Sequence, residues 1–340
     1  MVTKIPATMR ALEMHAEDGK AESLKLVEKP VMAPGPGEVL IKVAAAPVNP
    51  SDLAFLKGMY GTRKKLPVVP GFEGSGTVIA AGSGIVPNFY VGRRVAFVAG
   101  DGDGTWAEYA VTSATLCIPL PQGVSLEQGS MAMVNPLTAL AFLEIVKQGR
   151  HKAIINTAAA SALGKMMLKL SLKNGLPIIH IVRRAEQVAE LRTLGAQHVL
   201  NSSDADFDTA LKAVARELKA TLAFDAVAGD LTSRVLRAMP RHSEIVIYGG
   251  LAEAAVRFDP GAFIFESKRV SGFWLPVWLA KRGLPSMALS AFKVRGLIAG
   301  DLSSEIRTRL PLSGATQGLA DYAANMSAGK VIFVPGEGQA

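Results

Sequence analysis

The chain has 340 residues, of which 49% are hydrophobic and 19% charged, with a formal net charge of +8 and one cysteine, Cys117. This length and composition are typical of a folded protein of two domains and exclude a disordered chain. A single cysteine excludes an intrachain disulfide and a cysteine-rich zinc site, and no apolar run reaches the roughly 18 to 20 residues that cross a bilayer.

The positive charge fits either nucleic-acid binding or a site for phosphate-bearing small molecules. The basic residues are scattered, and the densest run, Arg63-Lys64-Lys65, is short, so we disfavour nucleic acid as a partner. The N-terminal stretch has no apolar core like that of a signal peptide. We therefore expect a cytoplasmic protein, or one of an organelle matrix if a targeting segment has been removed.

The first part of the chain is predicted to be rich in strands. Apolar segments alternate there with turns that contain glycine or proline. Strands are expected at 9–14, 38–48, 74–83, 93–100 and 106–112. Short strands at this spacing are typical of a barrel-like domain.

From residue 127 the pattern changes to alternating helices and strands. Segment 126–147 has helical periodicity, with Pro136 near the start of its second helix. Strands are then expected at 153–156, 177–182, 198–201, 222–228 and 244–250, with a helix in each gap. This alternation predicts an α/β fold with a doubly wound parallel sheet from about 127 to 267. Residues 268–340, which end in a helix at 315–327 and a strand at 330–334, are expected to return to the first domain.

The first strand-to-helix turn of such a sheet holds the pyrophosphate of a dinucleotide, because helix N–H groups and the helix dipole meet there. Here the turn, residues 156–164, reads NTAAASALG and has one glycine where two or three are usual. Ser161 and Ala162 are small residues in the usual glycine places, and Ser161 can cap the helix. Gly164 allows close packing of helix and strand. We expect Ser161, Ala162 and Leu163 to contact a cofactor, with a plain helix start as the alternative.

The residues after the second strand predict the kind of dinucleotide. Arg183 lies 19 residues after Gly164, where an acid would bind the ribose 2′-hydroxyl of NAD and an arginine favours the 2′-phosphate of NADP. The segment PIIHIVRR contains no Asp or Glu. Arg183 and Arg184 therefore indicate NADPH as the cofactor. Two solvated charges at a strand end are the alternative.

Eight short motifs follow one another along the chain: APGPGEVLIKV, NPSDLAFLKGMYG, LPVVPGFEGSGTV, GTWAEY, VNPLTA, LRTLGAQHVLN, YGGLA and VSGFWL. On these motifs, between Met9 and Val334, the chain resembles the medium-chain dehydrogenase/reductase superfamily. Within it, the chain is most similar to the zinc-independent quinone oxidoreductases and the 2-enoyl thioester reductases. The resemblance implies a GroES-like β-barrel catalytic domain at 1–126 and 268–340. It also implies a Rossmann domain that binds NADPH at 127–267.

The motifs also bear on metal binding. Zinc-dependent relatives have a Cys ligand in the NPSD motif and a His ligand before Glu73, and here Pro50 or Ser51 and Phe72 stand at those places. Phe72 cannot bind a metal, whereas catalytic zinc takes three N, S or O side chains. The five histidines are spread without ligand spacing. We expect no metal.

Without a Lewis acid, hydride transfer from NADPH requires an acceptor that is already polarised, such as an α,β-unsaturated carbonyl or a quinone. In the enoyl reductases that the chain resembles, a tyrosine in a Gly-x-Tyr-Gly loop is assigned to proton transfer. The corresponding loop here is Gly58-Met59-Tyr60-Gly61. A phenol is protonated at physiological pH and can donate. We therefore expect an NADPH-dependent reductase of 2-enoyl thioesters or related enones, with Tyr60 as proton donor. The alternatives are an NADPH:quinone oxidoreductase and a non-catalytic NADPH-binding sensor or structural protein, and for Tyr60 a packing role.

The resemblance implies further cofactor contacts at motif positions near the nicotinamide, the phosphates or the cofactor cleft: Asn49, Thr138, Tyr248, Gly249, Phe273, Trp274, Leu275 and Lys330. Of these, Lys330 is expected at the phosphates and residues 273–275 over the nicotinamide. For Trp274 a core or interface position is the alternative. In relatives the sheet edge near residues 244–275 pairs with its copy in a second subunit, so a homodimer is expected.

Overall fold

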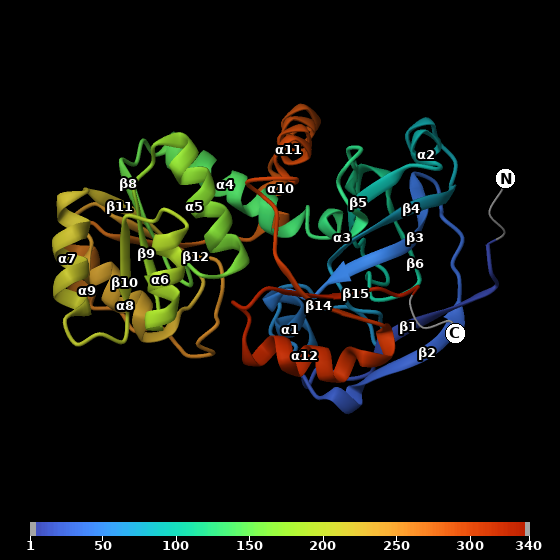
Figure 1. Ribbon diagram of the computed structural model, residues 1–340, viewed down its shortest axis with the longest axis horizontal. Coiled ribbons are helices and arrows are strands. Elements are labelled where there is room, and N and C mark those ends of the chain that lie inside the picture. Colours follow the sequence, from blue (N-terminus) through green and yellow to red (C-terminus); the bar gives the residue numbers. More distant parts are fainter. Residues whose placement is uncertain (1–4, 337–340) are drawn as a thin grey trace. The chain divides into compact units, whose positions relative to one another are not determined.

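The computed structural model describes residues 5–336, apart from the side chains of Ala21, Leu284, Pro285 and Ala288 (Figure 1). The chain divides into two compact units. The first unit comprises the residues up to Pro136 and those from Ala291 onward, and the second comprises Leu137–Ser290. The first four and last four residues of the expected catalytic domain lie outside the described part. The expected domain boundaries at 126/127 and 267/268 stay a prediction.

The first unit contains a seven-stranded sheet of order β14-β15-β3-β4-β5-β7, with β6 paired to β3, and a separate two-stranded sheet of β1 and β2. The strands are β1 (Thr8–Met14), β2 (Leu24–Pro30), β3 (Glu38–Pro47), β4 (Glu73–Ala81), β5 (Arg94–Val98), β6 (Tyr109–Ser113), β7 (Cys117–Pro119), β14 (Ile306–Leu310) and β15 (Lys330–Phe333). β14 and β15 pair in parallel, and the other pairings are antiparallel. The core of this unit includes Trp106, whose ring centroid lies 5.1 Å from that of Phe333.

Helices of the first unit are short and lie in the connections between strands. They are α1 (Pro50–Leu56), α2 (Ile85–Tyr90), α3 (Leu126–Gly129) and α12 (Ala315–Ala324), with 3-10 turns η1 (Ala21–Ser23), η2 (Ala114–Leu116) and η3 (Leu312–Gly314). Pro50 is the first residue of α1, where a proline costs no helical hydrogen bond. Helices α4 (Val134–Gln148) and α11 (Leu284–Leu297) each begin in one unit and end in the other.

The second unit is a six-stranded parallel sheet of order β10-β9-β8-β11-β12-β13. Its elements are β8 (Ala153–Asn156), α5 (Ala162–Asn174), β9 (Ile178–Val182), α6 (Ala185–Thr193), β10 (His198–Asn201), α7 (Phe207–Glu217), β11 (Ala220–Asp225), α8 (Gly229–Ala238), β12 (Glu244–Ile247), α9 (Pro260–Ile264), β13 (Arg269–Gly272) and α10 (Leu275–Ala280). Every residue of β8 and β9 is buried. Continuous apolar strands of this kind are typical of a parallel sheet with both faces covered.

The strand order of this sheet reverses between β8 and β11. From β8 the chain proceeds to β9 and β10 on one side, and β11, β12 and β13 follow on the other. Ligands of such sheets bind outside the carboxyl ends of the strands at this switch point. The expected α/β fold with a doubly wound parallel sheet is confirmed.

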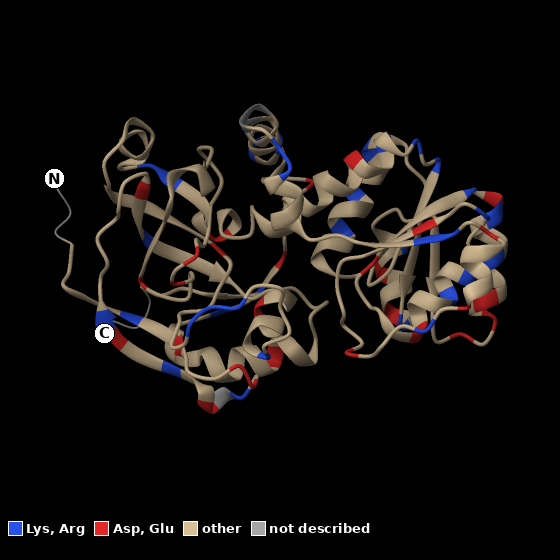
Figure 2. Ribbon diagram, turned by 180° about the vertical axis from the view of Figure 1, so that it is seen from behind, with Lys and Arg blue, Asp and Glu red and all other residues tan. Residues whose placement is uncertain are grey.

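Charged residues of both signs are distributed over both units. In Figure 2 the blue Lys and Arg positions are interspersed with red Asp and Glu positions. Within the part of the chain that the structure describes, no helix combines the length and the apolar character needed to cross a membrane.

Candidate functional site

The loop between β8 and α5 lies at the switch point of the second unit. Ser161 is the N-cap of α5, and its Oγ accepts a hydrogen bond from Gly164 N at 3.2 Å, which confirms the expected cap. Ala162 and Leu163 are the first two residues of the helix. Helix geometry leaves N–H groups of the first turn without a carbonyl partner inside the helix. Such groups, together with the helix dipole, can bind a phosphate.

Gly164 brings α5 against the loop that precedes it. A Cβ at this position would lie 2.2 Å from Ala159 O and 2.7 Å from Ala159 Cα, distances that no side chain tolerates. Ala159 N in turn donates to Ile181 O of β9 at 3.1 Å, so the loop is fixed to the sheet. The close packing expected at Gly164 is confirmed.

Asp225 connects the two loops that flank the switch point. Its side chain is fully buried at the end of β11, and its carboxylate accepts hydrogen bonds from Thr157 Oγ1 at 2.6 Å and from Thr232 Oγ1. The backbone N–H groups of Val227 and Ala228 donate to it at 3.0 and 3.1 Å. Because Thr157 precedes α5 and the other three donors belong to the start of α8, Asp225 holds both helix starts in place.

Sequence reasoning missed Asp225, although a signal for it exists. The segment LAFDAVA has one acid at the end of an otherwise apolar strand. A buried charge needs several hydrogen-bond donors, and at the end of a parallel strand the donors of the next loop are close. An acid in that place therefore indicates a residue that organises a loop.

The two predicted 2′-phosphate ligands follow β9 but differ in their surroundings. Arg183 is exposed, and its carbonyl oxygen accepts from Ser203 Oγ at 3.0 Å. Arg184 is the N-cap residue of α6, and its Nε lies 2.6 Å from Glu186 Oε1. Arg183 therefore presents its guanidinium to solvent at the end of β9, whereas Arg184 is paired with a carboxylate. Their roles in cofactor binding stay predictions.

Tyr248 and Phe273 come together on one aromatic ring of the second unit. Phe142 of α4 stacks on Phe224 of β11, with ring centroids 3.9 Å apart and an interplanar angle of 9°. The rings of Tyr248 and Phe273 each approach Phe142 edge-on, with centroids at 5.0 Å. Burial, and secondly the charge of Asp225, raises the pKa of Tyr248 well above its usual value, so its hydroxyl is neutral.

Other predicted cofactor residues of the second unit lie at the ends of elements. Gly249 follows β12, and a Cβ there would lie 2.7 Å from Ala226 O, so the two loops approach closely. Trp274 is the N-cap of α10, and Leu275 is its first residue. Thr138 is buried within α4. The structure leaves the roles of these residues toward a cofactor as predictions.

Asn49 and Lys330, predicted as separate cofactor contacts, are brought together in the first unit. Both are buried, with 1% and 2% of their surface exposed. Lys330 Nζ donates a hydrogen bond to Asn49 Oδ1 and lies 3.4 Å from Val48 O. Asn49 Nδ2 donates to Glu73 Oε1 at 3.0 Å. The expected phosphate contact of Lys330 stays a prediction, and its ammonium already has these internal partners.

Glu73, the first residue of β4, is fully buried. Its Oε2 accepts hydrogen bonds from Met133 N at 3.0 Å and Val134 N at 2.9 Å, so the carboxylate caps the start of α4. Burial raises the pKa of Glu73, while the charge of Lys330 lowers it. Burial lowers the pKa of Lys330, while the charge of Glu73 raises it. The two charges therefore interact within the protein interior, and each opposes the other's desolvation.

A second buried carboxylate, Asp52, lies in the same cluster. Its Oδ2 accepts from Asn49 N at 2.7 Å, and its Oδ1 accepts from Phe72 N at 3.0 Å. Burial raises the pKa of Asp52 to about 7, against the hydrogen bond from Asn49 N, which lowers it. Sequence reasoning missed the role of Glu73, because its partners are 24 to 61 residues away. It also missed Asp52, although Asn49 and Asp52 have the spacing of a capping box.

Tyr60, the predicted proton donor, lies in the loop after α1. Its ring packs on Phe72, with centroids 4.6 Å apart and an interplanar angle of 38°, and the side chain is half-buried at the margin of the core. The loop is held by Lys64, whose Nζ donates to Gly100 O at 2.8 Å and to Gly102 O at 2.6 Å. The basic run at residues 63–65 therefore includes a side chain with a structural role.

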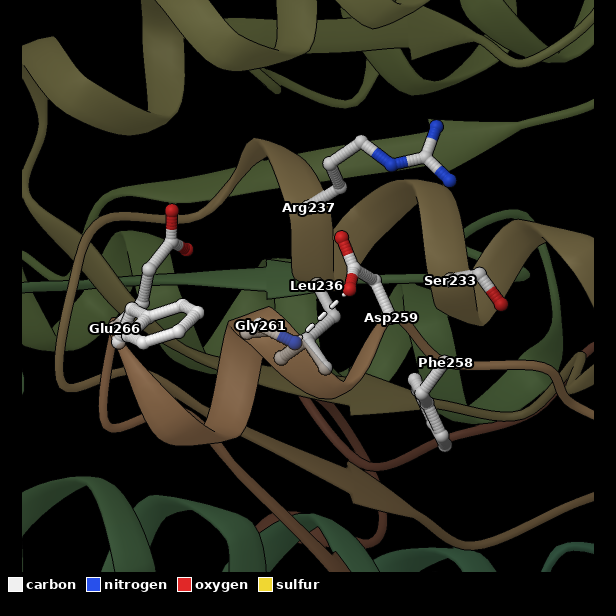
Figure 3. A pocket seen from close by; sticks show the side chains of 9 residues that line it. Ser233, Leu236, Arg237, Phe258, Asp259, Gly261 and Glu266 are labelled. Atoms are coloured by element: carbon white, nitrogen blue, oxygen red, sulfur yellow. Dashed lines mark hydrogen bonds between the residues drawn. The ribbon is translucent and has the colours of Figure 1, made fainter.

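A cavity of about 240 Å³ lies beside α8 and α9 of the second unit (Figure 3). Three of its four polar side chains, those of Ser233, Asp259 and Glu266, already have partners, and the fourth belongs to Arg237. Asp259 Oδ1 accepts from Gly261 N at 2.9 Å, the dashed line in Figure 3, and Glu266 lies 2.6 Å from Lys268 Nζ. Ser233 Oγ donates to Arg257 O. The cavity has no converging set of available polar groups, so we do not place the active site there.

Two protein-family models match the chain: the alcohol dehydrogenase GroES-like domain over residues 35–122, and the zinc-binding dehydrogenase over residues 162–289. The mitochondrial enoyl-[acyl-carrier-protein] reductase of Arabidopsis thaliana is 31% identical over 273 residues, which cover 78% of this chain and 72% of that protein. A solved structure of a candidate NADPH:quinone reductase from Mesorhizobium loti matches with a TM-score of 0.90 and 37% identity, over 98% of this chain and 100% of the other. A mycobacterial protein solved in complex with NADPH matches with a TM-score of 0.83 and 26% identity, over 96% and 100%.

The description of the second family model names zinc, and the residues described here do not fit that metal. Among residues 5–336, excepting the four undescribed side chains, no group of three or more His, Cys, Asp or Glu is placed to hold an ion. Asp52 and Glu73 are occupied by hydrogen bonds from within the protein. Cys117 is buried, and burial raises the pKa of its thiol to about 12, which disfavours the thiolate that binds zinc.

The family comparisons agree with the architecture of each unit. The GroES-like model falls within the strand-rich first unit, and the second model covers most of the parallel-sheet unit. The Arabidopsis relative extends the likeness over both units. The chain is an oxidoreductase that belongs to the medium-chain dehydrogenase/reductase superfamily, as an enoyl reductase- and quinone oxidoreductase-like protein.

Proposed function

We propose that the protein is an NADPH-dependent reductase of activated C=C bonds, acting on 2-enoyl thioesters or related enones. The observation that carries the proposal is the switch point of the second unit. There the capped start of α5 lies next to the loop fixed by Asp225, and Arg183 is exposed at the end of the neighbouring strand. The relatives that are enoyl reductases and the NADPH-bound mycobacterial structure support it.

The residues at the switch point fit a dinucleotide. The N-terminus of α5 offers N–H donors for the diphosphate, and Gly164 allows the helix to start close to the sheet. Arg183 can pair with the 2′-phosphate that distinguishes NADPH from NADH. NADPH, when bound, supplies the hydride. Ser161 and Ala162 stand where glycines are more usual, so we expect a site that binds the phosphates but holds them slightly further from the backbone.

The protein itself must stabilise the negative charge that appears on the carbonyl oxygen and protonate the α carbon. Tyr60 is our candidate for the proton donor. Its ring rests on Phe72, and the loop that follows is fixed by Lys64. The packing of its ring holds the Tyr60 side chain in one place, which suits a donor at a set position.

The test replaces Tyr60 by Phe and measures NADPH oxidation with a crotonyl thioester. We expect kcat to fall by about 10²- to 10⁴-fold, the usual contribution of a general acid, while the Kd for NADPH stays the same. Tyr109→Phe is the matched control, because Tyr109 is a half-buried tyrosine of β6 in the same unit. Unchanged turnover in Tyr60→Phe removes this residue from the mechanism.

The likeness to the Mesorhizobium loti structure favours a second candidate, an NADPH:quinone oxidoreductase. A quinone needs no proton on carbon, so Tyr60→Phe should then leave its reduction unchanged. A panel of enoyl-CoA esters, simple enones and quinones with NADPH and NADH decides between the two. Tight NADPH binding without turnover of any of them would instead identify a sensor or structural protein.

We also propose that the protein is a cytoplasmic homodimer formed through β13. β13 is the last strand of the sheet order, so its outer edge has no strand partner within the described chain. The N–H groups of Arg269 and Phe273 point inward, to Ser243 O and Ile247 O, which leaves the N–H of Val270 on the outer edge because strand N–H groups alternate. Val270→Pro should therefore lower the mass measured by light scattering from dimer to monomer, whereas an unchanged dimer would refute this interface.

A further inference from the structure

The side chain of Asn49 is held at both ends by charged groups of the first unit. Lys330 Nζ donates to its Oδ1, and its Nδ2 donates to Glu73 Oε1 at 3.0 Å. An ammonium can only donate and a carboxylate can only accept, so these partners permit a single orientation of the carboxamide. Oδ1 also takes part in the capping box of α1 with the backbone N–H of Asp52, so one N–H of the amide is left for another group.

Glu73 is itself fixed, which makes it a firm anchor for the amide. Its second oxygen accepts from two backbone N–H groups at the start of α4, Met133 N at 3.0 Å and Val134 N at 2.9 Å. The carboxylate cannot rotate without breaking all three of its hydrogen bonds. The position of the Asn49 amide is therefore tied to the first turn of α4.

Lys330 is oriented by internal groups. With 2% of its surface exposed, its ammonium contacts Val48 O as well as Asn49, and the charges of Glu73 and Asp52 act on it. A buried ammonium is tolerated where opposite charges compensate its lost hydration. If Lys330 turned toward a phosphate, it would leave Glu73 and Asp52 in the protein interior without a cation.

We propose that Lys330 and Glu73 are positioning residues that orient the Asn49 carboxamide, and that Lys330 affects cofactor binding through Asn49 instead of contacting a phosphate. This inference rests on the proposed function and on the expectation, implied by the family resemblance, that Asn49 contacts the cofactor. The remaining N–H of Asn49 would then meet a polar group of the cofactor in one fixed direction. The ammonium of Lys330 then needs no phosphate contact to affect cofactor binding.

A double-variant cycle tests the proposal. The Kd for NADPH is measured by fluorescence for the wild type, Asn49→Ala, Lys330→Met and the double variant. We expect Lys330→Met to weaken binding about tenfold or more in the wild-type background, and by less than about twofold in the Asn49→Ala background, because coupled residues are not additive. If the two losses multiply, Lys330 acts independently of Asn49 and the proposal is overturned.

A ligand without nicotinamide separates the two roles of Lys330 directly. The probe is 2′-phospho-ADP-ribose, which keeps all the phosphates of NADPH. The proposal predicts that Lys330→Met leaves the Kd of this probe within about twofold of the wild type. A loss equal to that for NADPH would mean a phosphate contact and would refute the inference, while the proposed function would stand. If wild-type protein binds neither ligand, the proposed function fails and the inference with it.

Two further variants test whether any loss of binding comes from unfolding. Lys330→Met leaves two buried carboxylates without their cation and can unfold the protein, so Glu73→Gln/Lys330→Met, which removes one charge of each sign, is measured beside it. Lys268→Met is the matched control for losing a buried lysine, since the Lys268 side chain is 1% exposed and pairs with Glu266 in the second unit. The control should change the melting temperature but not either Kd. A comparable loss of NADPH binding in Lys268→Met would attribute the effect of Lys330→Met to general destabilisation and refute the positioning role.

Discussion

Replacing Gly164 by Ala tests whether the start of α5 must lie close to the sheet. The added Cβ would lie 2.2 Å from Ala159 O, and because real Cβ contacts stay beyond 3.0 Å, the helix or the loop must move back by at least 0.8 Å. Overpacking of this kind costs about 1 to 3 kcal/mol, and the contact is with backbone, which yields least. The better helix propensity of alanine returns about 1 kcal/mol. We therefore expect a net loss of up to about 2 kcal/mol in the free energy of unfolding.

Urea denaturation gives the stability change, and an NADPH titration gives the effect on the site. A shift of this size at the proposed phosphate-binding turn should weaken NADPH binding by about tenfold or more, since geometry there would set the length of several hydrogen bonds. Gly296→Ala is the matched control: Gly296 also lies in a helix, α11, and a Cβ there meets nothing within 4 Å. The control should be neutral or more stable by up to about 1 kcal/mol. If Gly164→Ala behaves like Gly296→Ala in both measurements, the close-packing argument is wrong.

Three further outcomes follow from individual side chains. Arg183→Ala should weaken NADPH binding by about 10- to 100-fold and leave NADH binding unchanged, as expected for one charge-assisted contact; equal losses for both cofactors would contradict its assignment to the 2′-phosphate. Asp52, with its pKa raised from 3.8 to about 7, holds its proton to higher pH in the folded protein than in the unfolded chain. Its contribution to stability is therefore full below about pH 4 and is lost as pH rises to about 7. The stability of the wild type relative to Asp52→Asn should accordingly fall by up to about 4 kcal/mol over that range, by urea titration at each pH, and a difference independent of pH would refute this. The buried thiol of Cys117, with its pKa raised to about 12, should resist iodoacetamide at pH 8 until the protein is unfolded, and rapid labelling of native protein would be inconsistent with its burial.

In the parallel sheet of the second unit, β8 to β12 were predictable because each is a short, largely apolar run between helices, whereas β13, which reads RVSG, was not predicted. β2 and β14 were not predicted, because they are polar. β2 reads LKLVEKP and buries mainly its first residue. β14 carries Arg307 and Arg309, and Arg309 pairs at 2.7 Å with Glu127, which lies 182 residues away in the sequence. Partners so distant leave no periodic pattern for a strand to show.

The residues of the candidate site also divide into those that the sequence could predict and those that it could not. Ser161 and Gly164 were predicted because capping and close packing depend on neighbours within one helical turn. The cluster of Asn49, Glu73 and Lys330 was not predicted as a cluster, since its members are 24 and 281 residues apart. Motif comparison named Asn49 and Lys330 singly, and only the pairing of β15 with β3 shows that they meet. The expected helix at 315–327 ends at Ala324 because Asn325 adopts an extended φ of −149°.

The position of β15 between β14 and β3 has a consequence for synthesis on the ribosome. The second unit is one uninterrupted stretch of chain and can mature while the C-terminus is still being translated. The first unit must wait, since its sheet is completed by a strand that ends only at Phe333. During that interval two acidic groups destined for the interior lack their lysine counter-ion, so the nascent N-terminal segment is the part of this polypeptide most in need of a chaperone.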